Sequence, residues 1–372
     1  MGEKGAMVRS IQRSVTVAAT LIAGLIPAAT GAAAPLVASS ARAAGQAATS
    51  CSTVATIPVE PVGNVPTGVA VNPRTNKIYV VTINSSTGLG QVTVISGKTN
   101  TVVATVPVGS SAAGVAVNPR TNKIYVTYVA NTNTGAGAVA VISGRTSKVV
   151  ARVHVSFGPS GVAVNPRTNK IYVANTNQVF HHVQSTVSVI SGRTNKVIAA
   201  IPVSLSPIAI AVNPRTNKIY VISQTGNTVQ VISGRASKVV ARVHVGFSPT
   251  WVAVNPRTNR IYVTFVNIAA NLSNNSVLVI SGRTSKVVAT IPVRIEPGGV
   301  AVNPRTRTIY VAGAPVHVRS GVMLVISGRT NNVVATALAG SLPFGVAVNL
   351  RTRAIYVIND DDNTVVFTCR RG

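Results

Sequence analysis

The chain has 372 residues, of which 34 are Lys or Arg and only 6 are Asp or Glu, so its formal net charge is +28. Hydrophobic residues make up 46% of the chain and charged residues only 11%, which excludes a charge-dense disordered tail. A single long apolar stretch excludes a multi-span membrane protein, and the scarcity of acids disfavours an enzyme that uses paired carboxylates. The basic excess favours a polyanionic partner.

The N-terminal segment has the three parts of an export signal. Lys4, Arg9 and Arg13 precede an uncharged stretch, residues 14–41, that is rich in Ala, Val, Leu and Ile. Residues 41–43 read Ala-Arg-Ala and supply the small side chains that a signal peptidase requires. We therefore predict a signal peptide that is cleaved after residue 43.

The alternative to cleavage is an anchor helix that stays attached. Pro27 and Pro35 interrupt the apolar stretch and make it a weak span, so cleavage is preferred. Removing residues 1–43 takes away four basic residues and one acid, which leaves about +25 on the remainder. The predicted organisation is a signal peptide over 1–43, a short linker over 44–50 and a single folded domain over 51–372. The expected location is secreted, extracellular or at the cell surface, with no transmembrane span after cleavage.

The remainder of the chain is a sevenfold repeat. The tripeptide Asn-Pro-Arg occurs six times, a seventh copy reads Asn-Leu-Arg, and successive copies lie 42 to 48 residues apart. The copies begin at Asn72, Asn118, Asn165, Asn213, Asn255, Asn303 and Asn349. Each copy is followed by Ile-Tyr-Val, and six of the repeats carry a second marker, Ile-Ser-Gly before Lys or Arg. Self-similarity at this period is typical of stacked supersecondary units.

The repeat from residue 161 to residue 203 predicts four short strands. Apolar or alternating segments occupy 162–164, 171–173, 186–190 and 196–203. The turn between the first two contains Pro, which suits a type I turn, and Asn169, which tolerates the left-handed conformation. Four strands in about 45 residues predict an all-β fold, a seven-bladed β-propeller of four-stranded antiparallel blades.

The two ends of the domain are predicted to complete one blade together. The last repeat stops after its third strand, residues 364–368, and residues 53–59 read as a fourth strand. The N-terminal strand would thus complete the last blade and close the ring, which removes exposed sheet edges. Aligned with another repeat, Cys51 and Cys369 flank the position of a tight turn, so we predict a disulfide between them. The alternative is two unpaired thiols or one reactive thiol.

The repeat resembles the YVTN-type β-propeller repeat. The residues that carry the resemblance include Tyr-Val-Ala-Asn at 172–175, Val-Ile-Ser at 189–191 and Lys-Val-Val-Ala-Thr-Ile at 286–291. It covers about residues 51–372 and implies a propeller fold in a secreted or surface-layer-like protein. It does not imply one function, since relatives include nucleic-acid binders, lactonase-like enzymes and haem-domain propellers. The chain departs from the pattern by lacking acids in its two tight turns.

The basic residues are predicted to crowd one face of the propeller. In such a fold the turns between the first two strands and between the last two emerge together. These turns hold 26 of the 34 basic residues, whereas Glu60, Glu296 and residues 360–362 fall on the opposite face. The candidate polyanion-binding residues are Arg74, Lys77, Arg120, Lys123, Arg167, Lys170, Arg215, Lys218, Arg257, Arg260, Arg305, Arg351, Arg145, Arg193, Arg235 and Arg283.

Two interpretations of this face remain open. The first is docking of a polyanion such as nucleic acid, an acidic cell-wall polymer or anionic lipid, through salt-sensitive phosphate contacts. Because the turns contain no Phe, Tyr or Trp, base-specific recognition is disfavoured. The second is that these are solvated turn residues copied by repeat duplication.

The opposite face carries the remaining candidates. Ser160, Thr250, Trp251 and Phe344 are expected at the mouth of the central channel, where propellers usually bind ligands. His181, His182, His317 and Asp360 are weak metal candidates, since no set of ligands with metal-site spacing accompanies them. No nucleophile motif or phosphate-binding loop is present, and no cofactor is expected.

The sequence therefore favours a monomeric, non-catalytic binding scaffold with a basic face. The main alternative is a propeller enzyme of lyase or lactonase type that works at the channel mouth. A third possibility is a passive surface-layer component. Polar groups from several blades that met around a metal at the channel mouth would favour the enzyme.

Overall fold

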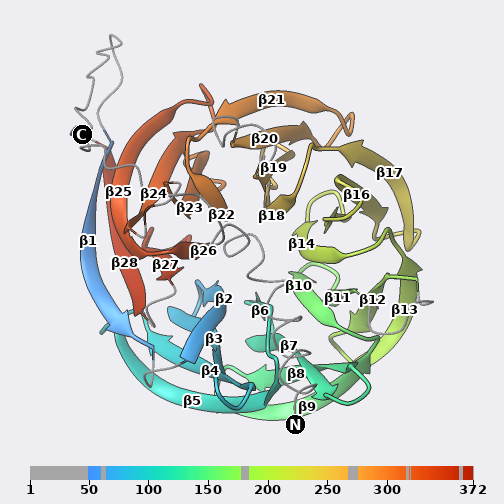
Figure 1. Ribbon diagram of the computed structural model, residues 1–372. Coiled ribbons are helices and arrows are strands. Elements are labelled where there is room, and N and C mark those ends of the chain that lie inside the picture. The colour runs from blue at the N-terminus through green and yellow to red at the C-terminus, as the bar shows by residue number, and fades with distance from the viewer. Residues whose placement is uncertain are drawn as a thin grey trace, which may run out of the picture.

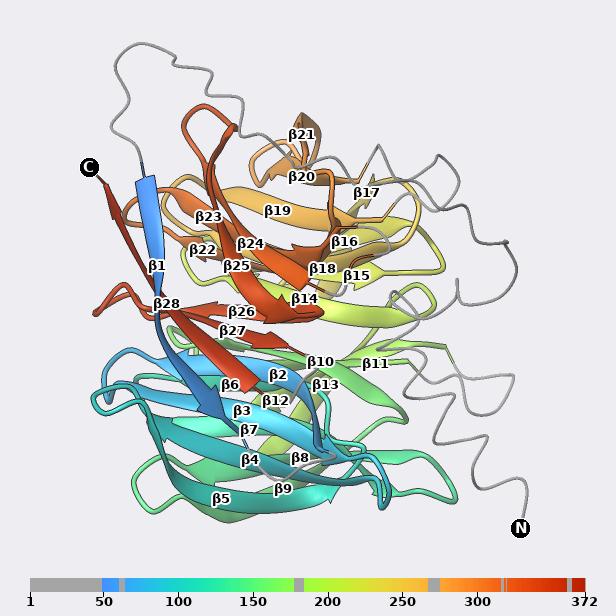
Figure 2. The ribbon, with the colours of Figure 1, turned by 60° about the vertical axis from the view of Figure 1, so that its left-hand side comes forward.

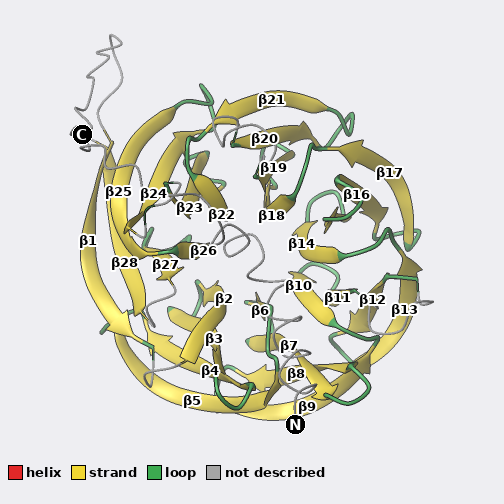
Figure 3. Ribbon diagram, viewed as in Figure 1, coloured by secondary structure: helices red, strands yellow, loops and turns green. Residues whose placement is uncertain are grey.

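Short apolar segments separated by turn sequences form β-strands along the described chain. The computed structural model describes residues 49–59, 64–176, 184–266, 275–315, 318, 320–359 and 363–371. Within these ranges all regular elements are strands, as Figure 3 shows. The strands are β1 (Thr49–Pro58), β2 (Asn64–Asn72), β3 (Lys77–Asn84), β4 (Leu89–Ser96), β5 (Thr101–Ser110), β6 (Val115–Asn118), β7 (Lys123–Asn131), β8 (Ala136–Ser143), β9 (Lys148–Val155), β10 (Pro159–Asn165), β11 (Lys170–Asn175), β12 (Thr186–Ser191), β13 (Lys196–Pro202), β14 (Pro207–Asn213), β15 (Lys218–Ser223), β16 (Thr228–Ser233), β17 (Lys238–His244), β18 (Pro249–Asn255), β19 (Arg260–Phe265), β20 (Ser276–Ser281), β21 (Val287–Pro292), β22 (Glu296–Asn303), β23 (Thr308–Ala314), β24 (Ser320–Ser327), β25 (Val333–Ser341), β26 (Pro343–Val348), β27 (Ile355–Asn359) and β28 (Asn363–Arg371).

The strands pair into antiparallel sheets whose order follows the chain. Four sheets hold β10 to β13, β14 to β17, β18 to β21 and β22 to β25, and a fifth has the order β1-β28-β27-β26. The sixth sheet has eight strands, because one residue pair, Ser110 with Val129, joins β2 to β5 with the next four strands. Figure 1 shows these units arranged around a common centre, each with its first strand innermost. The all-β, propeller-like fold of four-stranded antiparallel units is confirmed.

The strands predicted for the repeat at 161–203 are present as β10 to β13. The first three are longer than predicted by one to a few residues, because polar residues that flank the turns, such as Asn165 and Lys170, still pair with each other, whereas β13 ends one residue earlier, at Pro202. Asn169 has the expected left-handed conformation, with φ of 52°. The local turn and strand chemistry was therefore predictable from the sequence.

The tyrosine of each Ile-Tyr-Val strand packs between neighbouring repeats. Tyr125 lies in one cluster with Ile171, Val173 and Ile190 of the following repeat, and its side chain is fully buried. The other six tyrosines make the equivalent contact: Tyr79, Tyr172, Tyr220, Tyr262, Tyr310 and Tyr356. A buried aromatic of this size is a large apolar contribution to each junction. The tyrosines therefore join the units into one core.

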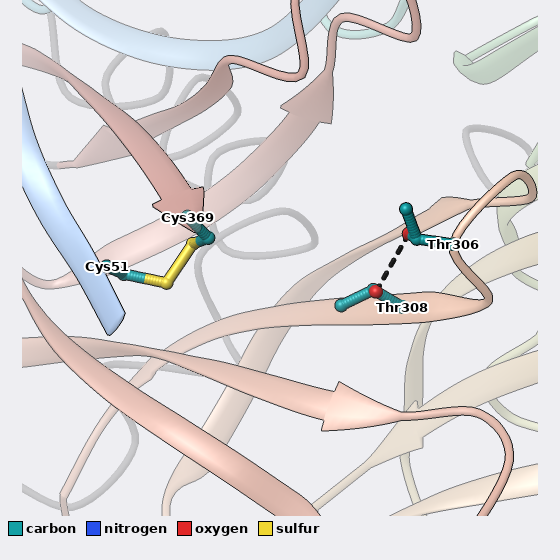
Figure 4. Close-up of a disulfide and its surroundings, with 4 residues drawn as sticks. All are labelled: Cys51, Thr306, Thr308 and Cys369. Atoms are coloured by element: carbon teal, nitrogen blue, oxygen red, sulfur yellow. Dashed lines mark hydrogen bonds between the residues drawn. A yellow bond between two sulfur atoms is a disulfide. The ribbon is translucent and has the colours of Figure 1, made fainter. Parts of the chain in front are cut away.

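The first and last described strands pair with each other. β1 lies antiparallel to β28, and Figure 2 shows the two side by side. Cys51 is opposite Cys369, and a disulfide joins them with 4.1 Å between the Cα atoms (Figure 4). The predicted disulfide is confirmed. β1 begins at Thr49, two residues before the predicted start of the domain.

The predicted signal peptide, residues 1–43, lies outside the described residues. Within the described part of the chain, no helix is long and apolar enough to cross a membrane.

Removing the disulfide is expected to destabilise the protein. Replacing both cysteines, Cys51→Ser with Cys369→Ser, frees a loop of 318 residues in the unfolded state. We expect the free energy of unfolding to fall by about 2–5 kcal/mol, measured by urea denaturation. Wild-type protein treated with reductant serves as the control and should match the double variant. Unchanged midpoints in both samples would show that the bond contributes no stability.

The buried tyrosines predict a loss of stability at alkaline pH. Burial raises the pKa of Tyr79, Tyr125, Tyr172 and Tyr220 to about 12. The pKa of an unfolded tyrosine is about 10, so the unfolded chain releases protons that the native state retains. Stability should be intact below pH 10 and fall between pH 10 and pH 12, as followed by denaturation midpoints and tyrosinate absorbance.

Tyr125→Phe is the matched control for this pH dependence. The Tyr125 hydroxyl is buried without a hydrogen-bond partner, so its removal should cost little stability at neutral pH. The variant should lose less stability than the wild type between pH 10 and pH 12. An equal loss would assign the alkaline transition to other groups.

Candidate functional site

In six of the seven repeats two turns lie side by side. We call them the Asn-Pro-Arg turn, between the first two strands, and the Ser-Gly turn, between the last two. In the first repeat the Gly97 amide donates to the Asn76 carbonyl over 2.7 Å. Five further repeats have the equivalent bond at 2.8 Å, from Gly144, Gly192, Gly234, Gly282 and Gly328. These paired turns form one end of the molecule, which we call the turn face.

Glycine is required in the Ser-Gly turn by this close approach. A Cβ atom added to Gly234 would lie 2.6 Å from Asn217 Oδ1 and 2.7 Å from its carbonyl oxygen. Asn217 is itself held in the left-handed conformation, with φ of 55°. The repeated Gly and the repeated Asn therefore fit each other across the two turns.

The first asparagine of each Asn-Pro-Arg turn shapes its own turn. Asn72 Oδ1 accepts a hydrogen bond from the Arg74 amide over 3.0 Å. The same bond has the same length in all seven repeats, with the amides of Arg120, Arg167, Arg215, Arg257, Arg305 and Arg351 as donors. An asparagine that accepts from the amide two residues later builds an Asx turn. The turn therefore fixes the backbone position from which each arginine side chain extends.

The same asparagine also reaches the next repeat. Asn72 Nδ2 donates to Asn122 Oδ1 over 2.8 Å, and both partners come from turn-face residues of neighbouring repeats. Equivalent bonds join Asn118 to Asn169, Asn165 to Asn217, Asn213 to Asn259, and Asn349 to Asn76. We call this set the asparagine belt. The belt was not predicted, although in each of the first five turns a second asparagine follows the first at a spacing of four residues.

The belt is interrupted where arginine replaces its acceptor. Arg307 stands where the first five repeats have the left-handed asparagine, and Asn255 Nδ2 is buried without a hydrogen-bond partner. Arg353 makes the same replacement in the last repeat. Both arginines keep the left-handed backbone, with φ of 60° and 67°.

The lysine that ends the Asn-Pro-Arg turn has a structural partner. Lys77 Nζ donates to the Gly144 carbonyl of the next repeat over 3.2 Å. Lys123 and Lys218 make the equivalent bonds, to Gly192 and Gly282, over 3.4 and 2.9 Å. These side chains are half-buried, as are those of Lys170 and Arg260. Three of the four lysines predicted as polyanion contacts, Lys77, Lys123 and Lys218, therefore also brace neighbouring repeats, a role that the sequence did not predict.

The turn arginines, by contrast, extend into solvent. The exposed members of the predicted set are Arg74, Arg120, Arg167, Arg215, Arg257, Arg305 and Arg351 from the first turns, with Arg145, Arg193, Arg235 and Arg283 from the Ser-Gly turns. Glu296 is the one acid among the described residues, and it begins β22, whereas the turn-face residue Asn303 ends it. At the rise of an extended strand, the two are roughly 23 Å apart. The turn face therefore carries positive charge without a nearby carboxylate of the described chain.

Ser160 and Thr250, predicted at the channel mouth, are used in contacts between repeats. Ser160 Oγ donates to the Pro207 carbonyl over 2.7 Å. Thr250 is buried, and its Oγ1 lies 2.7 Å from Thr264 Oγ1 and 3.2 Å from the Pro297 carbonyl. Both hydroxyls thus have partners within the fold.

The two aromatic candidates at this end pack against core clusters. Trp251 lies against the cluster that contains Tyr262, and Phe344 against the cluster that contains Tyr356. Both are half-buried. Their contacts are those of side chains that cover the core near the centre of the molecule.

The metal candidates His181, His182, His317 and Asp360 lie outside the described residues. Within the described chain, no group of three or more His, Cys, Asp and Glu side chains is placed to hold a metal ion.

Comparison with known proteins shows the fold. A scan with protein-family models and a search of curated proteins found no match. Among solved structures, a chain of Kuenenia stuttgartiensis hydrazine synthase matches with a TM-score of 0.69 and 18% sequence identity. The match covers 83% of this chain and 96% of that one. At this identity the likeness shows a common architecture alone.

Restoring the missing acceptor of the asparagine belt should stabilise the protein. Arg307→Asn supplies an Oδ1 atom for Asn255 Nδ2 and places a residue that tolerates the left-handed conformation. We expect the free energy of unfolding to rise by about 1–2 kcal/mol, measured by urea denaturation. In an Asn255→Ala background most of this gain should disappear, and a full gain there would assign the effect to backbone strain alone.

Proposed function

We propose that the protein is a secreted, seven-bladed β-propeller that works as a non-catalytic scaffold and binds polyanions through its turn face. The observation that carries the proposal is the set of exposed arginines, one from each Asn-Pro-Arg turn, held by the same Asx turn in every repeat. A regular array of fixed cations suits a polymer with regularly spaced anions. The resemblance to YVTN-type repeats belongs to the same proposal.

Contacts between the first and last repeats support a closed ring of seven blades. Asn349 Nδ2 donates to Asn76 Oδ1 over 2.6 Å, which continues the asparagine belt from the last repeat to the first. Tyr356 packs with Ile78 and Val80, the same junction that the other tyrosines make with their following repeats. The eight-stranded sheet counts as two blades in this proposal, since a single residue pair joins its halves.

The disulfide supports an oxidising location. Stable disulfides are typical of secreted proteins and rare in the reducing cytosol. Together with the predicted signal peptide, the bond between Cys51 and Cys369 favours export. Partners outside the cell or at its surface are then the relevant ones, among them acidic polymers of the envelope and released nucleic acid.

The residue types on the turn face favour binding to the anionic backbone of a polymer rather than to its bases. Its exposed residues are Arg, Lys and Thr, with Ala236 and Asn332, and the turn sequences contain no Phe, Tyr or Trp on which bases could stack. Guanidinium groups remain charged at all physiological pH values and pair with phosphate through two parallel hydrogen bonds. Such a face would bind according to anion spacing rather than base sequence.

A salt titration tests the proposal. Mature protein is mixed with labelled poly(glycerol phosphate), short duplex DNA and heparin, and affinity is measured at rising salt. We expect binding to at least one polymer at low salt, weakened about 10³-fold between 50 and 200 mM salt if six phosphates are contacted. No binding to any of the three polymers at low salt would overturn the proposal.

Charge-matched pairs of variants distinguish the turn face from general charge. Arg257→Gln with Arg351→Gln removes two exposed turn-face arginines, whereas Arg242→Gln with Arg294→Gln removes two exposed arginines elsewhere. For a single-stranded polyanion, the turn-face pair should weaken binding about tenfold and reduce the slope of log affinity against log salt concentration by about 1.4. The control pair should change neither quantity. Equal effects of the two pairs would show that only net charge matters.

A further inference from the structure

The sixth and seventh repeats depart from the others at the turn face. Their Asn-Pro-Arg turns read Arg-Thr-Arg, at residues 305–307 and 351–353, where the first five repeats have Arg-Thr-Asn. The position of the bracing lysine is also changed, to Thr308 and Ala354. In these two turns all the positive charge is therefore supplied by arginine. We call Arg305, Arg307, Arg351 and Arg353 the arginine sector.

The departure has a structural cost. Arg307 removes the acceptor of Asn255 Nδ2, which is left buried and without a partner. A buried donor without a partner destabilises a fold, and the left-handed backbone disfavours arginine more than asparagine. Local features that reduce stability tend to persist where they serve a function.

The compensating gain is a dense group of exposed guanidinium groups. All four sector arginines are exposed, whereas in the earlier repeats the asparagine that Arg307 and Arg353 replace is half-buried, and so is the second cation of the turn, a lysine or Arg260. The two turns lie in contact, because Arg305 Nη1 donates to the Leu350 carbonyl over 3.3 Å. Each sector turn thus presents two solvent-facing cations where the earlier turns present one.

Neighbouring residues hold the sector in place. Thr306 Oγ1 lies 2.8 Å from Thr308 Oγ1, so the two hydroxyls on either side of Arg307 are joined by a hydrogen bond (Figure 4). The charges of Arg260 and Arg307 both act on the Tyr262 hydroxyl and partly offset the rise of its pKa that burial causes.

We propose that the arginine sector is the primary anchoring site for a linear phosphodiester polymer with small, non-aromatic units. The proposal rests on the polyanion-binding function and names the part of the turn face that dominates it. Arginine, unlike lysine, offers a planar fork that matches two phosphate oxygens, and the sector uses arginine alone. The absence of aromatic residues from these turns favours a polymer without bases to stack.

Restoring the sequence of the earlier repeats gives a test that does not endanger the fold. Arg307→Asn with Arg353→Asn removes two sector charges and supplies the acceptors that the asparagine belt lacks. The matched control, Arg120→Asn with Arg167→Asn, removes two exposed turn-face arginines from the second and third repeats. Binding of both variants and the wild type to labelled poly(glycerol phosphate) is compared at low salt, and thermal midpoints are recorded.

We expect the sector variant to bind about tenfold more weakly, with a thermal midpoint no lower than that of the wild type, and the control variant to lose less than about threefold. Equal losses in the two variants would overturn the sector while leaving the general polyanion function intact. Tighter binding of heparin or of duplex DNA than of poly(glycerol phosphate) would overturn the assigned ligand. If the wild type bound none of the three polymers, the proposed polyanion-binding function would be overturned, and the sector proposal that rests on it would be overturned as well.

Discussion

The structure depends on the amide of one asparagine in each repeat. In all seven repeats its oxygen accepts from the amide of the arginine two residues later, and in five of them its nitrogen donates to the next repeat, as with Asn165, Arg167 and Asn217. One side chain thus sets the turn and joins neighbouring units. Because it is buried, neither bond competes with water. Because these turns carry the exposed arginines, the buried asparagine network determines where the arginines lie. A change in the network would therefore also change the charged surface.

Much of the fold was predictable because its information is local. The turn around Asn169 follows from the conformational preferences of adjacent residues, and the strands β10 to β13 follow from apolar alternation. The pairing of Cys51 with Cys369 was also predictable, since aligned repeats place both residues at one turn position. In each case a short stretch, read against its own copies, contains the necessary information.

The candidate site was less predictable because its contacts cross between repeats. Lys77 and Arg74 are three residues apart and equally charged in the sequence, yet one braces a carbonyl 67 residues away and the other is solvent-exposed. The hydroxyl of Ser160 likewise finds its carbonyl partner 47 residues later. A count of charges in the sequence does not distinguish such residues. The placement of neighbouring repeats shows which cations bond within the fold and which are exposed for binding.

The pairing of β1 with β28 has a consequence for how the chain is made. The two strands are the first and last of the described structure, and 318 residues separate the bonded cysteines. At 5–20 residues per second, a ribosome needs roughly 15–60 s to traverse that distance. During this interval β1 exists without its partner, while the units between them can already form. Assembly of the last sheet is therefore a late event, and a nascent chain that stalls before β28 leaves an unpaired N-terminal strand free to associate with other chains.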